Sequence, residues 1–126
     1  MDAGEATMQT VLMVPLVILV LMMSVQAALW FHTANVAGAA AGEGAAAAAA
    51  AHLSDGEASL RGVRAAQDLS GDAHVSLATA PLVAVDARQV VITVRAVVPR
   101  VVPFFPSIVT RSALEPREVL INEADR

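Results

Sequence analysis

Few side chains in this 126-residue sequence could carry out catalysis or bind a metal ion. The sequence contains no Cys, which excludes disulfides and thiolate metal ligands. The three histidines, His32, His52 and His74, lack the i, i+4 or short-loop spacing typical of metal ligands. No serine considered as a nucleophile lies in a Gly-x-Ser-x-Gly frame; these are Ser54, Ser70 and Ser107. We therefore expect no enzyme activity, and no cofactor or metal.

Charge and glycine patterns also argue against nucleic acid and small-molecule substrates. The formal net charge is −4, and the basic residues are all Arg, placed singly among acids rather than in a stripe that follows phosphates. Gly38, Gly42 and Gly44 lie within an alanine run instead of following a strand, so they do not form a nucleotide-binding loop. Without its apolar segment the chain is about the size of one small domain.

A long apolar segment near the N-terminus is the strongest structural signal. Residues 6–42 contain no Asp, Glu, Lys or Arg, and residues 11–31 are almost wholly apolar, with Ser24 and Gln26 as the polar insertions. A helix that crosses the hydrocarbon core of a bilayer needs about 20 such residues. We therefore predict a polar head over residues 1–10 and a transmembrane helix over residues 11–31.

Two features of this segment predict how it behaves in the membrane. Trp30, Phe31 and His32 resemble an aromatic girdle at the point where the helix leaves the lipid. Pro15 lies one turn inside, where membrane helices tolerate proline as a kink or a local loosening. An incidental kink and a functional hinge remain equal alternatives for Pro15.

The next segment, residues 33–51, consists almost entirely of small side chains and predicts a continued helix. Ala34, Gly38, Gly42 and Ala46 recur every four residues on one stripe. Such a stripe lets a second helix approach closely, so it is either an assembly surface or a face packed on the protein's own domain. Glu43, the first charge after the apolar segment, is either a solvated helix residue or the partner of a cation on a neighbouring subunit.

A second, shorter helix is predicted after a break near residues 52–54. Ser54 and Glu57 match a capping box, and Gly71 is a plausible stop after a helix that reaches about residue 69. Apolar and small residues recur at helical spacing, and polar residues occupy the opposite side. The first group comprises Leu60, Val63 and Ala66, and the second comprises Arg61, Arg64 and Asp68.

Beyond Gly71 the period changes to two, which predicts three short antiparallel strands. The first is expected at residues 74–77, the second at residues 90–98 with even-numbered side chains facing the helix, and the third at residues 108–114. Residues 81–88 are expected to connect the first two strands. Such a sheet needs a covered face, which residues 33–69 can supply. Residues 32–126 are thus predicted to form a small α+β domain with an alanine-rich helical stalk.

These residues resemble the TadE-like pseudopilins of the tight-adherence (Tad/Flp-type) pilus system, the actinobacterial members most closely. The resemblance rests on residues 4–15, which begin Gly4-Glu5 and end in Pro15, and on the alanine-rich run around Glu43 at residues 39–47. The strands, the proline-rich loop and the closing Glu-Pro-Arg-Glu segment at residues 115–118 are compatible with it. The resemblance implies a pilin-like fold.

The resemblance also implies processing and assembly. A prepilin-type peptidase would cut after Gly4, which leaves Glu5 as the mature N-terminus. Gln9 then takes the fifth position, where pilins usually carry Glu, so it supplies a hydrogen bond but no charge. Assembly residues implied along the helix are Gln9, Pro15, Ala34, Gly38, Gly42 and Glu43. The implied partners are the membrane, the peptidase, other pilin subunits and the pilus assembly machinery, with the C-terminal domain outside the cytoplasmic membrane and a place in an extracellular pilus.

Two alternatives remain open. The chain could be a single-pass membrane protein whose exported domain binds an envelope partner without polymerising. It could also be a secreted domain released by signal peptidase near residues 37–39, although its apolar region is longer than usual for a signal peptide and lacks a basic flank. The mature N-terminus distinguishes these readings.

Overall fold

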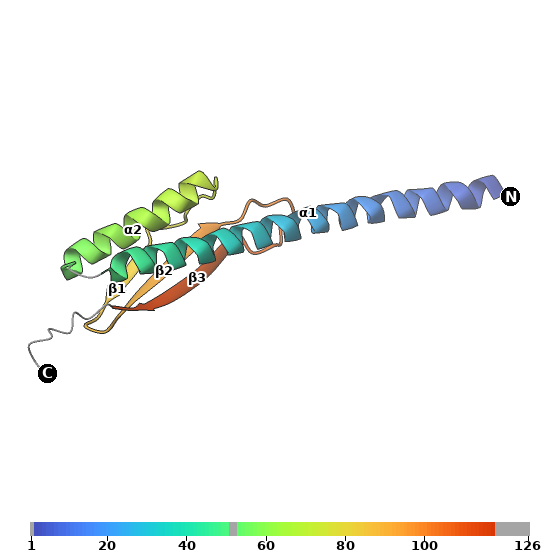
Figure 1. Ribbon diagram of the computed structural model, residues 1–126. Coiled ribbons are helices and arrows are strands. Elements are labelled where there is room, and N and C mark those ends of the chain that lie inside the picture. The colour runs from blue at the N-terminus through green and yellow to red at the C-terminus, as the bar shows by residue number, and fades with distance from the viewer. Residues whose placement is uncertain (1, 51–52, 118–126) are drawn as a thin grey trace, which may run out of the picture.

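The computed structural model describes residues 2–50 and 53–117. Two helices precede a three-stranded antiparallel sheet, in the order α1 (Asp2–Ala49), α2 (Asp55–Asp72), β1 (Leu82–Val85), β2 (Gln89–Val97) and β3 (Ile108–Pro116) (Figure 1). This architecture confirms the predicted α+β class, with a long apolar helix, a second helix and a small sheet.

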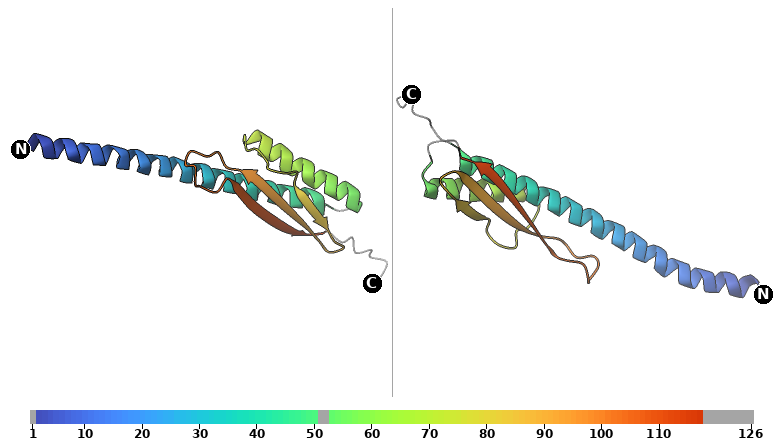
Figure 2. Two further views of the ribbon diagram at one scale, coloured as in Figure 1. Left: turned by 180° about the vertical axis from the view of Figure 1, so that it is seen from behind. Right: turned by 90° about the horizontal axis from the view of Figure 1, so that it is seen from below.

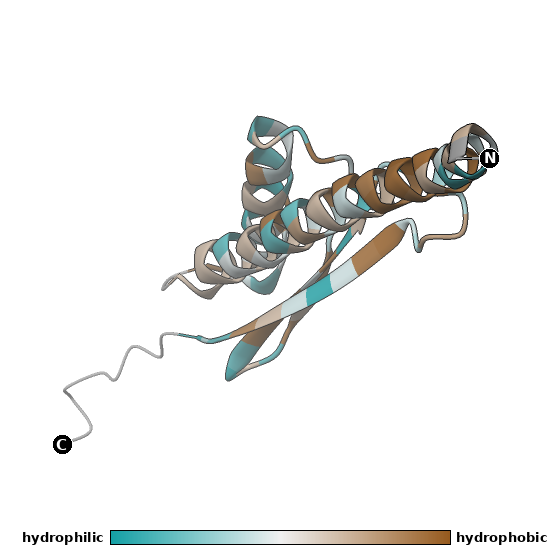
Figure 3. Ribbon diagram, turned by 90° about the vertical axis from the view of Figure 1, so that its right-hand side faces the viewer, coloured by the Kyte–Doolittle hydropathy of each residue, from teal (hydrophilic) through white to brown (hydrophobic). Residues whose placement is uncertain are grey.

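Helix α1 dominates the shape of the molecule. Its 48 residues correspond to about 72 Å at the rise of an α-helix. The N-terminal half projects alone, whereas the C-terminal half lies beside α2 and packs with it on one face of the sheet (Figures 1 and 2). Coloured by hydropathy, the projecting half is largely apolar, while α2 alternates polar and apolar positions (Figure 3). One continuous helix therefore passes from an uncovered segment into the folded domain.

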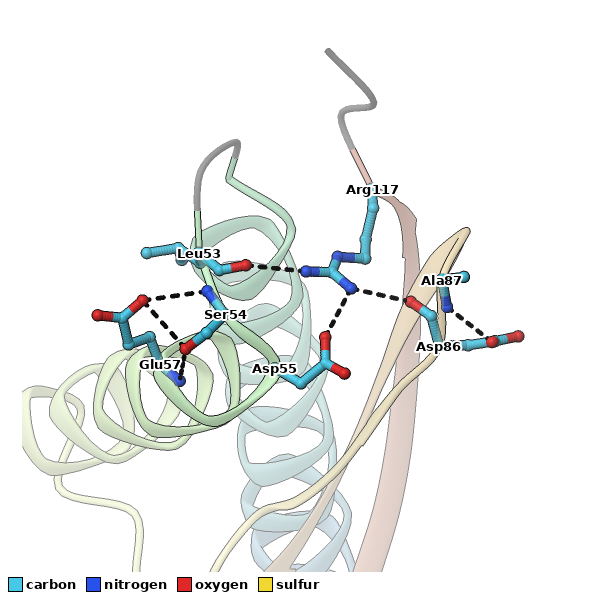
Figure 4. A network of polar contacts seen from close by, with 7 residues as sticks. All are labelled: Leu53, Ser54, Asp55, Glu57, Asp86, Ala87 and Arg117. Carbon is cyan, nitrogen blue, oxygen red and sulfur yellow. Dashed lines mark hydrogen bonds and ion pairs between the residues drawn. The ribbon is translucent and has the colours of Figure 1, made fainter.

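The break between the helices lies where the capping box predicts it. α1 ends at Ala49, and Ser54 caps α2: its hydroxyl accepts from the Glu57 N–H at 3.3 Å, and its own N–H donates to the Glu57 carboxylate at 3.0 Å (Figure 4). The backbone N–H of Ser54, and then its hydroxyl, lower the pKa of Glu57. His52 lies outside the described residues. The capping box is confirmed.

The buried face of α2 agrees only in part with the one predicted. Ala58, Gly62, Ala66 and Ser70 are buried, which confirms Ala66, whereas Val63 is half-buried and Leu60 is 61% exposed. Small residues face inward because α1 passes close to this side of α2: a Cβ added at Gly62 would lie 3.1 Å from the Gly44 carbonyl oxygen. Arg61, Arg64 and Asp68 are exposed, as predicted. The helix also runs to Asp72, past Gly71.

The sheet has β2 at its centre, with β1 and β3 antiparallel on either side. The even-numbered side chains of β2, Val90, Ile92, Val94 and Ala96, are fully buried against the helices, as predicted. β3 begins at Ile108 as predicted and extends to Pro116. Pro116 is tolerated because it is the last residue of an edge strand.

The first predicted strand is wrong. Residues 74–77 form only an isolated bridge, Leu77 to Ala96, and β1 lies instead at Leu82–Val85, within the segment expected to be a connector. His74 adopts a left-handed backbone with φ 57°, so the extended run cannot begin there. Ser76 and Ala78 still bond to β2, through Val97 N–H to Ser76 O and Ala78 N–H to Arg95 O, both 2.8 Å. The chain then loops out before Pro81 and re-enters as β1.

Arg117 fastens the end of β3 to the start of α2. Its guanidinium donates to Asp55 Oδ1 at 2.8 Å, to the Leu53 carbonyl at 3.0 Å and to the Asp86 carbonyl at 3.2 Å (Figure 4). One charged group thus satisfies three oxygens from two segments, residues 53–55 and Asp86, that are distant from each other in sequence.

The core depends on a close approach of α1 and α2. A Cβ added at Gly44 would lie 2.8 Å from the Gly62 carbonyl oxygen and 2.9 Å from Ile92 Cδ1. A Cβ added at Gly62 would lie 2.7 Å from the same Ile92 atom and 3.1 Å from Ala48 Cβ. The two glycines therefore make room for the side chain of Ile92 between the helices.

We predict opposite effects for two alanine substitutions on one helix. Gly44→Ala must push the α2 backbone away and should destabilise the domain by about 1–3 kcal/mol, as overpacking does. Gly42→Ala meets no atom within 4 Å and should stabilise by up to about 1 kcal/mol through helix propensity. Denaturant unfolding of the full chain in detergent, followed by fluorescence of the single Trp, measures both. Equal stabilities would refute the close approach at Gly44.

Candidate functional site

The projecting part of α1 is an uncovered apolar surface. Large apolar side chains from Met8 to Val25 are exposed, and the most apolar 18-residue window has a mean hydropathy of 2.5 with 6% of it buried. By length and composition α1 can cross a membrane. Exposed apolar surface of this extent indicates contact with lipid or with other apolar helices.

The hydroxyl groups in this segment are satisfied inside the helix. Thr7, Thr10 and Ser24 donate to the carbonyl oxygens of Ala3, Ala6 and Val20, at 2.7, 2.8 and 2.8 Å. Each bond reaches one turn back, so no hydroxyl needs water as a partner. Ser24 is therefore compatible with an apolar surrounding.

Pro15 lies inside α1 without ending it. Proline has no N–H, so the carbonyl of Val11, four residues earlier, receives no backbone hydrogen bond from it. The helix continues on both sides (Figure 1). Pro15 therefore removes one backbone hydrogen bond from the projecting segment without ending the helix.

Gln26 is the point where the apolar helix joins the domain, a role that the sequence reading missed. Its side chain is fully buried. The Oε1 atom accepts from the N–H groups of Val101, at 2.7 Å, and Val102, at 3.0 Å, and Nε2 donates to the Pro99 carbonyl at 3.2 Å. One amide thereby ties the proline-rich loop (residues 99–106), which joins β2 to β3, to α1.

Trp30 also belongs to this junction. It packs with Leu29 against the buried residues Ala34, Val98 and Val109, and the Arg111 guanidinium lies 5.6 Å from the centre of its ring, a cation–π distance. Phe31 is exposed, and its ring meets Trp30 edge-on at 5.4 Å. The sequence predicted that Trp30, Phe31 and His32 form an aromatic girdle where the helix leaves the lipid. In the structure Trp30 packs on the domain, whereas Phe31 and His32 are exposed.

The residues of the predicted small-residue stripe become more exposed toward the C-terminal end of α1. Ala34 is buried, Gly38 and Gly42 are partly exposed, and Ala46 is exposed. A Cβ added at Gly38 or Gly42 would meet no atom within 4 Å. The close helix contact inside the domain uses Gly44 and Gly62 instead, so the outer part of the stripe remains open.

Glu43 is exposed and lies beside α2. It lines a shallow hollow together with Ala65, Asp68, Leu69 and Asp72. Asp68 and Asp72 add two carboxylates to this hollow, and no cationic side chain lines it. The ion pair within the described residues is Arg117 with Asp55. Glu43 therefore has no cationic partner in this part of the chain.

Two of the three histidines come together, although their sequence spacing gave no sign of it. His32 of α1 and His74 after α2 line a cavity of about 200 Å³ together with Leu29, Thr33, Val75, Ser76, Val97 and Pro99. His74 Nδ1 lies 3.1 Å from the Asp72 carbonyl oxygen. Among the described residues, no group of three or more His, Cys, Asp or Glu could hold a metal ion.

Comparison with known families identifies the N-terminal part of the chain. Residues 4–46 match the family model described as TadE-like protein. This segment is TadE-like. No curated protein and no solved structure matches the chain. The resemblance first seen around Gly4-Glu5 and Glu43 is thus confirmed over residues 4–46, and with the apolar helix it fits a membrane-anchored component of a Tad pilus.

The TadE-like segment contains all the predicted site residues, but the structure spreads them along α1. Gly4 and Glu5 lie in its exposed first turns, and Gln9 lies one turn after Glu5 on the same side. More than 30 residues along the helix separate Gln9 from Gly42 and Glu43. Such residues can act together only between subunits, because one rigid helix keeps them apart.

We predict that Gln26→Leu releases the proline-rich loop while the sheet stays folded. Loss of the amide removes the acceptor of two N–H groups, each worth about 1 kcal/mol. Amide hydrogen exchange at Val101 and Val102 should accelerate roughly tenfold or more, whereas exchange at Ile92 stays unchanged. Ser24→Ala is the control, because the Ser24 hydroxyl bonds only within its own helix. Unaltered exchange at Val101 in Gln26→Leu would contradict this role.

Proposed function

We propose that this chain is a membrane-anchored TadE-like pseudopilin or minor pilin that helps to assemble a Tad-type pilus through its hydrophobic N-terminal helix. Its role is structural, without catalysis. The C-terminal domain lies outside the cytoplasmic membrane and becomes part of an extracellular filament when the subunit is incorporated.

One observation carries this proposal: α1 continues as a single helix from an uncovered apolar segment into the core of the domain. Residues 8–25 expose large apolar side chains, whereas Ala37, Ala40 and Ala41 of the same helix are fully buried. A flexible linker would leave a tethered domain free to rotate, but a continuous helix fixes the domain relative to the segment in the membrane. A filament built around such helices needs this fixed relation.

The energetics of transfer favour the same role. An apolar helix is stable in a bilayer and comparably stable in a bundle of similar helices, because lipid tails and apolar side chains offer similar surroundings. The helix-bonded hydroxyls of Thr7, Thr10 and Ser24 need no water in either place. Moving the subunit from membrane to filament therefore requires little net desolvation.

The packing of α1 disfavours release as a secreted domain. Cleavage near residues 37–39 would remove Gln26, Trp30 and Ala34, which hold the loop and the second buried cluster. It would also cut beside Ala37 and Ala40, both in the main core. A product that begins there would lose part of its own core.

We predict that a prepilin-type peptidase cuts after Gly4, so that the mature chain begins at Glu5. Intact-mass measurement on protein extracted from membranes should show the loss of residues 1–4. Gly4→Leu, which places a bulky side chain at the cleaved bond, should keep the full mass, while Ala3→Leu is still cut. Retention of Met1 in cells with an active peptidase would refute processing and favour a plain single-pass protein.

We further predict that the open part of the small-residue stripe contacts another subunit. Gly38→Leu should abolish cross-linking to partner subunits, because bulk prevents close approach of two helices. Membrane insertion and the stability of the domain should be retained, since the added side chain meets no atom of the chain within 4 Å at its Cβ.

Gly38→Ala is the matched control, since it keeps the side chain small and should assemble normally. Gly42→Leu and Gly42→Ala repeat the comparison one turn further along the stripe. Normal cross-linking in both leucine variants would show that the stripe is not an assembly surface. If no cross-links form even in the wild type, the protein is an anchored domain that does not polymerise.

A further inference from the structure

The proline-rich loop is the part of the domain that reaches furthest along α1 toward the N-terminus (Figures 1 and 2). Gln26 holds it there through its bonds to Pro99, Val101 and Val102. The loop carries an exposed apolar tip: Phe104 is 96% exposed and Val101 is 37% exposed. The apolar tip lies beside the uncovered apolar part of α1, so both surfaces are suited to the same apolar environment.

The length of the uncovered helix places this loop at the membrane surface. Residues 6–25 carry no charge, and their 20 residues measure about 30 Å, the thickness of the hydrocarbon core. Glu5 then lies at one boundary and Gln26 at the other. Because Gln26 contacts the loop directly, the loop lies where the helix leaves the hydrocarbon.

The backbone of the loop suits a region that is poor in water. Pro99, Pro103 and Pro106 have no N–H to satisfy. The N–H groups of Val101 and Val102 bond to Gln26, and that of Phe105 bonds to the Val102 carbonyl at 3.2 Å. Six of the eight residues from 99 to 106 therefore need no water as acceptor for their backbone, which lowers the cost of leaving bulk solvent.

The side chains around the tip match the chemistry of a lipid surface. No Asp or Glu occurs over residues 87–114, so no carboxylate of this hairpin opposes approach to lipid phosphates. Arg100, next to Val101, is exposed and donates to Ser107 Oγ at 3.0 Å. Phe and other large apolar side chains of interfacial segments enter the boundary between headgroups and acyl chains, and Arg favours the phosphate level.

We propose that the proline-rich loop is a second membrane contact, in which Phe104 and Val101 enter the bilayer interface and Arg100 lies at the lipid phosphates. The proposal rests on the proposed function in one respect, that α1 spans the bilayer. With two points of contact instead of one, the domain is held at a fixed height and a fixed rotation about α1 before it is incorporated in a filament.

The absence of Cys allows a direct test with single labels. Full chains carrying Phe104→Cys, Leu60→Cys or Val14→Cys are labelled with a polarity-sensitive fluorophore and reconstituted in vesicles of phosphatidylcholine and phosphatidylglycerol. Leu60 is the matched control, because it is also a large exposed apolar residue but lies on α2. Val14 reports whether α1 itself is inserted.

We expect the label at position 104 to shift to the blue and to lose fluorescence to a quencher attached near the lipid headgroup. The label at position 60 should respond only to aqueous iodide, and the label at position 14 only to a quencher deep in the acyl chains. If position 14 is deep and position 104 is quenched by iodide like position 60, the loop proposal is wrong. If position 104 becomes protected only in assembled filaments, it is a subunit contact and the proposal is equally wrong. Exposure of position 14 to iodide would instead refute anchoring by α1.

Discussion

One helix must be stable in two surroundings at once, and the rest of the structure follows from this constraint. The N-terminal half of α1 is apolar on every side, as lipid or a helix bundle requires, whereas the C-terminal half carries Ala and Gly and lets α2 and the sheet approach. Neither half offers a charged residue over residues 6–42. The two halves therefore differ in whether the rest of the domain packs on them. Along α1 the first fully buried residue is Gln26.

The small side chains of α1 explain how a domain of this size obtains a core. Alanines at positions 37, 40, 41, 45 and 48 bury little area each, but they bring the backbones of α1, α2 and β2 close together. Ile92, the largest fully buried side chain among the described residues, enters the space that Gly44 and Gly62 leave. Dispersion contacts rise steeply as backbones approach, so stability here comes from proximity more than from large apolar side chains.

The parts of the fold that sequence reasoning predicted well depend on neighbours along the chain. The Ser54–Glu57 capping box spans four residues, and the alternation in β2 is a local period, so both could be read directly. The predicted strand at residues 74–77 failed because His74 turns out of the extended region, which an alternation of apolar residues does not reveal. Gln26 and Arg117 were missed for a further reason: their partners lie 75 and 62 residues away. Spacing predicted the stripe of Ala34, Gly38, Gly42 and Ala46. It could not show that Gly42 of this stripe is open while Gly44, which does not belong to it, is enclosed.

Because residues 6–42 contain no charged side chain, something other than flanking charges must limit how deeply α1 enters a membrane. Membrane helices are usually held in register by Lys, Arg, Trp and Tyr at their ends, but here Trp30 packs into the domain and the first Arg is Arg61. Glu5 can limit movement at one end only. At the other end the helix could slide until the folded domain meets the lipid, and the first part of the domain to do so is the loop that Gln26 holds. The folded domain therefore takes the place of flanking charges, and the position of Gln26 in the sequence sets how much of α1 can be withdrawn into apolar surroundings.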